Sequence, residues 1–142
     1  MAMKATGLMI GDWVNYSILN LNAKVFSILG NHTIGIKFVD KNNKVEAIHG
    51  LIEETINPIP LTEEILMKNG FSYEHEEETC STCSYHHWQL VGEYLALDDC
   101  QYWRKEKKDD LPRFRISGID VNYVHQLQHL LRLCGVEKEL TI

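Results

Sequence analysis

The sequence lacks the features that would place it in or across a membrane. No apolar run approaches the roughly 20 residues that a helix needs to span a bilayer, so we expect no membrane contact. The segment from Met1 to Ile10 has one Lys and no small-residue cleavage site, which predicts that there is no signal peptide. Nothing in the sequence indicates that the four Cys belong to an exported protein with disulfides. We therefore expect reduced thiols and a cytoplasmic location.

Motifs of common catalytic sites are also missing. The chain has no Gly-x-Ser-x-Gly turn and no glycine-rich phosphate loop. His125 and His129 have the spacing of a zinc-protease helix, but position 126 is Gln where the catalytic Glu would stand. In the adjacent acids Glu53-Glu54 and Asp98-Asp99, the two members of each pair would point to opposite faces of a strand, so neither pair is a candidate for acid-base catalysis. We expect a protein that is not an enzyme.

What is present is an ordinary globular composition. The 142 residues are 44% hydrophobic and 24% charged, which is typical of one folded domain. Pro58 and Pro60 interrupt the chain near its middle. We expect a single compact domain over residues 1–142, with a β-barrel-like part at 1–60 and an α+β part at 61–142.

The first part reads as short strands at roughly ten-residue spacing. Apolar and β-branched residues fill four segments, and Thr33 to Val39 shows strict alternation. The expected strands are Ile10–Tyr16, Ala23–Leu29, Thr33–Val39 and Val45–Ile52. This pattern predicts a small curled sheet or an SH3-like barrel.

The second part predicts two helices around a β-rich segment. Thr62 is suited to cap a short helix from Glu63 to Asn69 that ends at Gly70. The acidic stretch from Glu74 to Cys83 indicates a loop or hairpin tip, and His87 to Leu97 a strand pair that turns near Gly92. Leu127 and Leu131 centre an apolar stripe that predicts an amphipathic helix from Tyr123 to Cys134, with Leu133 and Cys134 also in the stripe. Gln128 belongs to the polar flank of this helix, which we expect to face water or a partner. The final residues, Glu139 to Ile142, are expected to form a short strand. The fold class is therefore α+β.

Charge is segregated along the chain, whose net charge is −6. Residues 1–45 carry a net charge of +3 and residues 100–142 one of +2, whereas residues 46–99 carry twelve acids and one base, Lys68. Such a block is either a solvated face or a surface that docks on a basic partner. The candidate partner-binding residues are Glu74, Glu76, Glu77 and Glu78.

A basic and aromatic segment at 102–115 is the candidate nucleic-acid contact. Cations that follow phosphates and rings that stack on bases are the mixture that binds single strands. Glu106, Asp109 and Asp110 offset part of the charge, so a solvated hairpin tip is the alternative. The residues of the candidate contact are Tyr102, Trp103, Arg104, Lys105, Lys107, Lys108, Arg113 and Arg115.

Cys80-x-x-Cys83 followed by His86 and His87 is the best metal candidate in the sequence. Thiolate and imidazole are the ligands that tetrahedral zinc prefers. No second ligand pair follows at a standard distance, so we expect neither a zinc ion nor another cofactor.

Two segments carry a family resemblance. The stretch from Ile56 to Leu66 (INPIPLTEEIL) with Gly70-Phe71, and the stretch from Tyr123 to Gln128 (YVHQLQ) with Leu130 and Gly135, resemble small uncharacterised proteins of Bacteroidetes-type prophages and mobile elements. The opening Ile10 to Val14 is similar to the usual first strand of that group. The resemblance implies a mobile-element origin, a shared scaffold and a bacterial host cell, and it carries over no catalytic residue.

Three functions are consistent with these observations. The first is a non-catalytic phage or mobile-element protein that inhibits a host defence nuclease complex, as anti-CRISPR proteins do, by binding a host protein or ribonucleoprotein. The second is a nucleic-acid-binding module that contacts RNA through residues 102–115. The third is a structural or housekeeping phage protein. The sequence leaves the partner and the oligomeric state open.

Overall fold

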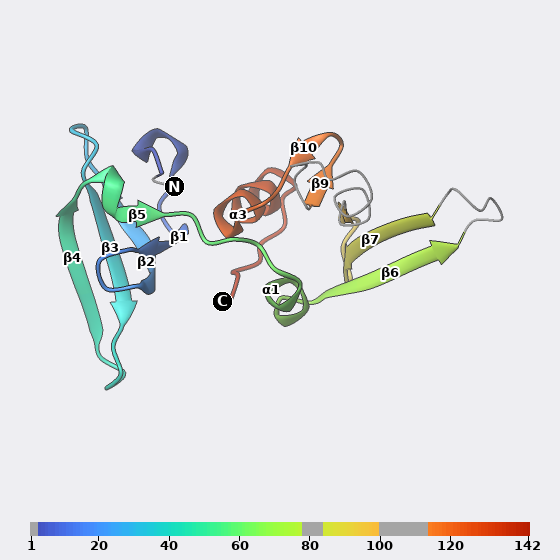
Figure 1. Cartoon of the computed structure of the whole chain (residues 1–142), viewed down its shortest axis with the longest axis horizontal. Helices are drawn as coiled ribbons and strands as arrows, with labels where there is room; N and C mark the ends of the chain where they lie inside the picture. Colours follow the sequence, from blue (N-terminus) through green and yellow to red (C-terminus); the bar gives the residue numbers. More distant parts are fainter. Residues whose placement is uncertain (1–2, 78–83, 100–113) are drawn as a thin grey trace. The chain divides into compact units, whose positions relative to one another are not determined.

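The protein has the mixed α+β fold that the sequence predicts. The computed structural model describes residues 3–77, 84–99 and 114–142, and it describes the side chains of these except at 75–77 and 84–86. Two antiparallel sheets of five strands each are accompanied by helices α1 and α3 (Figure 1). Within these ranges no helix is both long and apolar enough to cross a membrane.

The chain divides into two compact units. The first unit comprises Met1–Pro60 and Tyr123–Gln128, and the second comprises Leu61–Asn122 and His129–Ile142. The boundary at Pro60 follows the proline-interrupted segment, where neither a ladder nor a helix can continue.

The first unit is built on a meander whose last strand returns to the first. The strands are β1 (Trp13–Tyr16), β2 (Leu21–Ile28), β3 (Ile34–Val39), β4 (Val45–Leu51) and β5 (Ile56–Asn57). A 3₁₀ turn, η2 (Glu53–Thr55), precedes β5, which pairs with β1 and gives the order β4-β3-β2-β1-β5. The strands that the sequence predicts in this part are thus present, and they form one five-stranded antiparallel sheet.

Alternation along these strands places one set of side chains in a core. Val14, Ala23, Val25, Ile34 and Ile36 are all buried, and their neighbours along each strand face the other way. The turns are set locally, because the Asp40 carboxylate accepts hydrogen bonds from the backbone N–H groups of Asn42 and Lys44.

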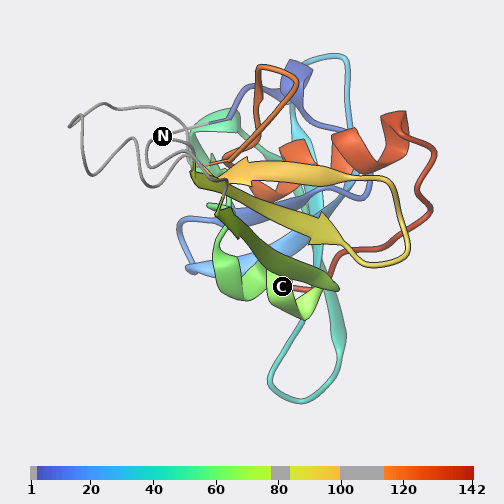
Figure 2. The same cartoon turned by 90° about the vertical axis from the view of Figure 1, so that its right-hand side faces the viewer.

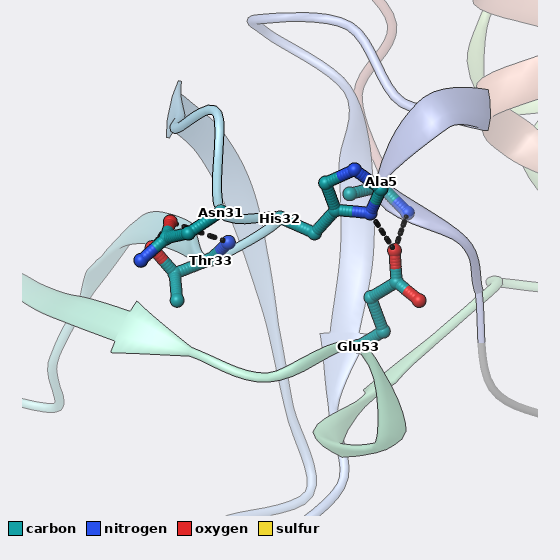
Figure 3. A network of polar contacts seen from close by, with 5 residues as sticks. All are labelled: Ala5, Asn31, His32, Thr33 and Glu53. Carbon is teal, nitrogen blue, oxygen red and sulfur yellow. Dashed lines mark hydrogen bonds and ion pairs between the residues drawn. The ribbon is translucent and has the colours of Figure 1, made fainter.

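The N-terminal segment is attached to this sheet by backbone and carboxylate contacts. A 3₁₀ turn, η1 (Ala5–Gly7), follows Met3, whose N–H donates to the carbonyl of Ile56. Glu53 Oε1 accepts a hydrogen bond of 2.6 Å from the Ala5 N–H and lies 3.5 Å from His32 Nδ1 (Figure 3). These contacts fix η1 on the first unit.

Helix α3 (Val124–Leu133) contributes its first residues to the first unit. Leu127 and Leu131 are fully buried, as the apolar stripe predicts. The expectation that Gln128 faces water or a partner is wrong, because its side chain is buried. Its Oε1 accepts from the Trp13 N–H at 2.9 Å, and its Nε2 donates to the Gly11 carbonyl at 3.0 Å. Leu133 and Cys134, expected in the stripe, are exposed.

The second unit begins with helix α1 (Glu63–Lys68). Thr62 caps it by accepting a hydrogen bond from the Ile65 N–H, and Gly70 follows with a φ of 86°, so both predicted helix signals are confirmed. The buried Asn69 side chain exchanges two hydrogen bonds with the Thr141 backbone. Residues 139–142, expected as a short strand, are not a strand but are held in this way.

The second sheet has the order β10-β9-β8-β7-β6. Its strands are β6 (Phe71–Glu77), β7 (Ser84–Leu90), β8 (Ala96–Asp99), β9 (Phe114–Ile116) and β10 (Ile119–Asp120). Figure 2 shows β6, β7 and β8 side by side. One face is apolar and buried, with Phe71, Trp88, Leu97 and Phe114 at its centre. The turn between β7 and β8 contains Gly92, as expected, with a φ of 87°.

The acidic stretch is the main correction in this unit. Glu74, Glu76 and Glu77 were expected in a loop or hairpin tip, but they belong to strand β6, which pairs with β7 along its whole length. Glu is depleted in strands in general, and pairing with β7 overrides that preference here.

Candidate partner-binding site

The structure describes only part of each predicted site. Glu74 is fully described, whereas Glu76, Glu77 and His86 are described in their backbone alone. Arg115 lies in β9 and His87 in β7. The remaining predicted residues lie outside the described residues: Glu78, Cys80, Cys83, Tyr102, Trp103, Arg104, Lys105, Lys107, Lys108 and Arg113.

Register brings one residue from each predicted site into a single row. Across the sheet, Glu74 lies opposite His87, His87 opposite Asp98, Asp98 opposite Arg115, and Arg115 opposite Asp120. Residues that are directly opposite share a face of the sheet. The row therefore combines a predicted acidic residue, a predicted metal ligand and a predicted nucleic-acid contact.

Charges within the row are paired with one another. His87 Nε2 lies 3.0 Å from Glu74 Oε2, which is within hydrogen-bonding distance. Arg115 Nε donates to Asp120 Oδ1 at 3.0 Å. Arg115 thus has an acidic neighbour, which reduces the charge it could offer to a phosphate. Phe114, next to it, is fully buried and cannot stack on a base.

Tyr73 forms a second acidic cluster on the other face of β6. Its ring packs on the buried Trp88 with a centroid distance of 5.3 Å, and Trp88 Nε1 donates to Asp99 Oδ2 at 3.2 Å. Burial, and then the negative charges of Asp99 and Glu63, raise the pKa of the Tyr73 phenol above its ordinary value of 10.0. Tyr73 nevertheless remains 48% exposed.

Tyr73 and Glu74, one from each feature, belong to an edge strand. In the described part of the chain, β6 pairs with β7 and with no other strand. The side chain of Glu74 is 49% exposed on one face of β6, and Tyr73 is half-exposed on the other. We call Glu63, Tyr73, Glu74 and Asp99 the β6 surface. Tyr73, with Asp99 and Glu63 near its ring, is suited to contact a cationic partner, and Glu74 adds a carboxylate on the opposite face of the same edge strand.

A cavity lies in the first unit. It has a volume of about 340 Å³ and lies between η1 and the start of α3. The rings of Tyr123 and His125, which help to line it, are stacked 5.9 Å apart. Its lining residues are Met3, Lys4, Thr6, Gly7, Pro58, Tyr123, His125 and Gln126. These lining residues include the Thr6 hydroxyl and the His125 ring but no carboxylate, so they do not supply the acid of a nucleophile-base-acid triad.

A metal site is not assembled by the residues that the structure describes. Within them, no three His, Cys, Asp or Glu side chains lie close enough together to hold an ion. His87 is buried against Glu74. The two Cys of the predicted motif lie outside the described ranges, so zinc binding by that motif stays a prediction.

Sequence reasoning missed Tyr73 and Asp99 as parts of this surface. Tyr73 reads as an ordinary aromatic residue of a strand, and only the register places it on Trp88 beside Asp99. Comparisons of the chain with protein-family models, curated proteins and solved structures give no match. The site therefore rests on its own geometry.

Proposed function

We propose that this protein is a non-catalytic interaction protein whose β6 surface docks on a basic partner. The observation that carries the proposal is Tyr73, an exposed ring on an edge strand with Asp99 and Glu63 close enough to raise its pKa. Tyrosine is among the residues that most often dominate binding energy in interfaces. The surrounding carboxylates supply electrostatic attraction to Lys and Arg.

The charge distribution supports the same function. Residues 46–99 carry twelve acids and one base, and the β6 surface lies within that block. Acidic groups at the rim of an interface mainly accelerate association, and they disfavour partners of like charge. Nucleic acids carry negative charge and would be repelled here, so the partner is a protein surface rich in Lys and Arg.

The nature of the partner follows from the proposed origin. If the chain is a mobile-element protein, as its motifs suggest, the groove that holds nucleic acid in a host defence nuclease complex is the basic surface it would occupy. Blocking that groove would inhibit the complex without any chemical step.

A capture experiment with two matched tyrosine variants tests this function. Wild-type protein, Tyr73→Ala and Tyr94→Ala are immobilised and exposed to a host lysate with and without added nuclease. Tyr94 is fully exposed on the turn between β7 and β8 and serves as the control for loss of a ring. We expect a defined protein set to be retained by wild type and Tyr94→Ala, to survive nuclease treatment and to be lost with Tyr73→Ala.

The expected loss is large because a buried interface tyrosine is worth about 2 kcal/mol or more, which is roughly a 30-fold weaker affinity. Retention of the same proteins by Tyr73→Ala would exclude the β6 surface as the contact. If nuclease treatment removes the proteins that the wild type retains, a nucleic acid and not the β6 surface holds them.

A further inference from the structure

The face of the first sheet opposite the core carries aromatic and cationic side chains. Core residues alternate with residues that point to this face. In register across β1 to β4, Trp13 lies opposite Lys24, Lys24 opposite Lys37, and Lys37 opposite Ala47. We call Trp13, Lys24, Phe26, Lys37 and His49 the aromatic-cationic face.

Each lysine at the centre of this face lies over a ring. Lys24 Nζ is 5.1 Å from the centroid of the Trp13 ring, and Lys37 Nζ is 4.9 Å from that of Phe26. The edge of His49 meets Phe26 at a centroid distance of 5.0 Å and an angle of 89°. Two ring–ammonium pairs, Trp13 with Lys24 and Phe26 with Lys37, thus lie next to each other on this face.

A bulge and a glycine position the Phe26 ring. The pairing of β2 with β3 shifts between Val25 and Ser27, so Phe26 is the extra residue of a bulge. Bulges re-aim a side chain and are frequent beside functional sites. A Cβ on Gly35 would come within 2.8 Å of the Phe26 ring, so any other residue at this position would force the ring to move.

The face has no negative charge among the strands that form it. Glu46 is the one Asp or Glu in β1 to β4, and it pairs with Phe38, which places it on the opposite face. Lys37 and His49 are exposed, and Trp13, Lys24 and Phe26 are half-buried. The charge of this face is therefore opposite to that of the β6 surface.

We propose that the aromatic-cationic face binds single-stranded nucleic acid. Proteins hold single strands by combining cations that follow the phosphates with rings on which bases stack. An acidic peptide would use the two ammonium groups but would have no use for the two flat rings. This site is independent of the β6 surface and of residues 102–115.

Fluorescence anisotropy with labelled single strands tests the proposal on the full chain. The probes are 12-nucleotide oligouridylate and oligothymidylate, titrated with protein between about 50 and 200 mM salt, a range over which phosphate contacts weaken strongly. We expect Trp13→Leu and Phe26→Leu each to weaken binding about 5- to 100-fold, because each removes a stacking surface. The double variant Lys24→Gln/Lys37→Gln should also flatten the dependence of log K on log salt by about 1.4, or about 0.7 for each phosphate contact.

A control variant removes the same charge elsewhere. Lys68→Gln/Lys138→Gln changes two lysines of the second unit and should bind as the wild type does. Thermal melts test whether each variant is folded. The single variant Lys37→Gln should fold as the wild type does, because Lys37 is exposed. Tighter binding of oligouridylate than of oligothymidylate would identify RNA as the ligand. Equal affinities would show that the face binds single-stranded RNA and DNA alike.

Three results would overturn the proposal. The first is the absence of binding by the wild type. The second is binding that the face variants leave unchanged but that Trp103→Ala/Arg104→Ala abolishes, which would move the contact to residues 102–115. The third is equal binding of a labelled oligoglutamate peptide, which would make the face a receptor for acidic proteins.

Discussion

Gln128 shows how much one side chain can be misjudged from sequence. It lies among Asn122, His125 and His129 on a helix that reads as polar on this side. In the fold, its amide joins α3 to β1 by one accepted and one donated hydrogen bond. The two partners lie 115 and 117 residues away in the chain. No local pattern reveals such a contact.

We predict that Gln128→Ala lowers the free energy of unfolding by about 1–3 kcal/mol, because both hydrogen bonds are lost at a buried site. Chemical denaturation measures this loss. Arg132→Ala, an exposed position on the same helix, is the control and should change stability by no more than about 0.5 kcal/mol. Equal effects of the two variants would contradict the role of the Gln128 amide.

Tyr73 gives a prediction about pH. Its pKa is raised in the folded state, so its contribution to stability is complete below pH 10.0 and is lost as the pH rises through the folded pKa. Asp99→Asn should lower the pKa of Tyr73, and Glu63→Gln should lower it less, because Asp99 is the larger of the two charge effects. NMR titration of the tyrosine ring carbons follows this directly. An unchanged pKa in Asp99→Asn would show that Tyr73 does not feel this carboxylate.

At the scale of elements, the sequence was most informative where the pattern was local. Thr62, Gly70 and the buried Leu127 and Leu131 behave as their positions predict, since caps and apolar stripes depend on neighbours within a few residues. Glu74 to Glu77, the second half of β6, were expected in a loop or hairpin tip because consecutive acids are typical of loops. The pairing of β6 with β7 is a tertiary effect that overrides that local preference.

Helix α3 supplies the prediction at this scale. Leu127→Ala should cost about 2–5 kcal/mol, because it leaves a cavity at a fully buried position. Leu133→Ala, the same change at an exposed site of the helix, should cost no more than about 0.5 kcal/mol. Denaturant midpoints of the two variants provide the comparison. Similar midpoints would mean that the apolar stripe is not the packing face.

At the scale of the molecule, two surfaces of opposite character stand out. The β6 surface in the second unit is acidic, and the aromatic-cationic face in the first unit has two lysines and no acid. The linear charge pattern predicted an acidic block and a more basic first third. It could not predict which residues share a face, because that depends on register and on the bulge at Phe26.

The most direct test of the central claim is the salt dependence of association with the protein captured from the lysate. The triple variant Glu74→Lys/Glu76→Lys/Glu77→Lys reverses charge along β6. A control triple variant reverses three exposed acids elsewhere, Glu54, Glu64 and Glu137. Stopped-flow or surface-based kinetics give the association rate of each between low and physiological ionic strength.

We expect the β6 variant to associate at least about tenfold more slowly at low salt, because steering by rim charges acts on the association rate. The difference from wild type should shrink as salt is raised, since the screening length falls to about 8 Å at physiological ionic strength. The control variant should lose less at every salt concentration. If the two triple variants associate at the same rate, the β6 surface is not the docking site.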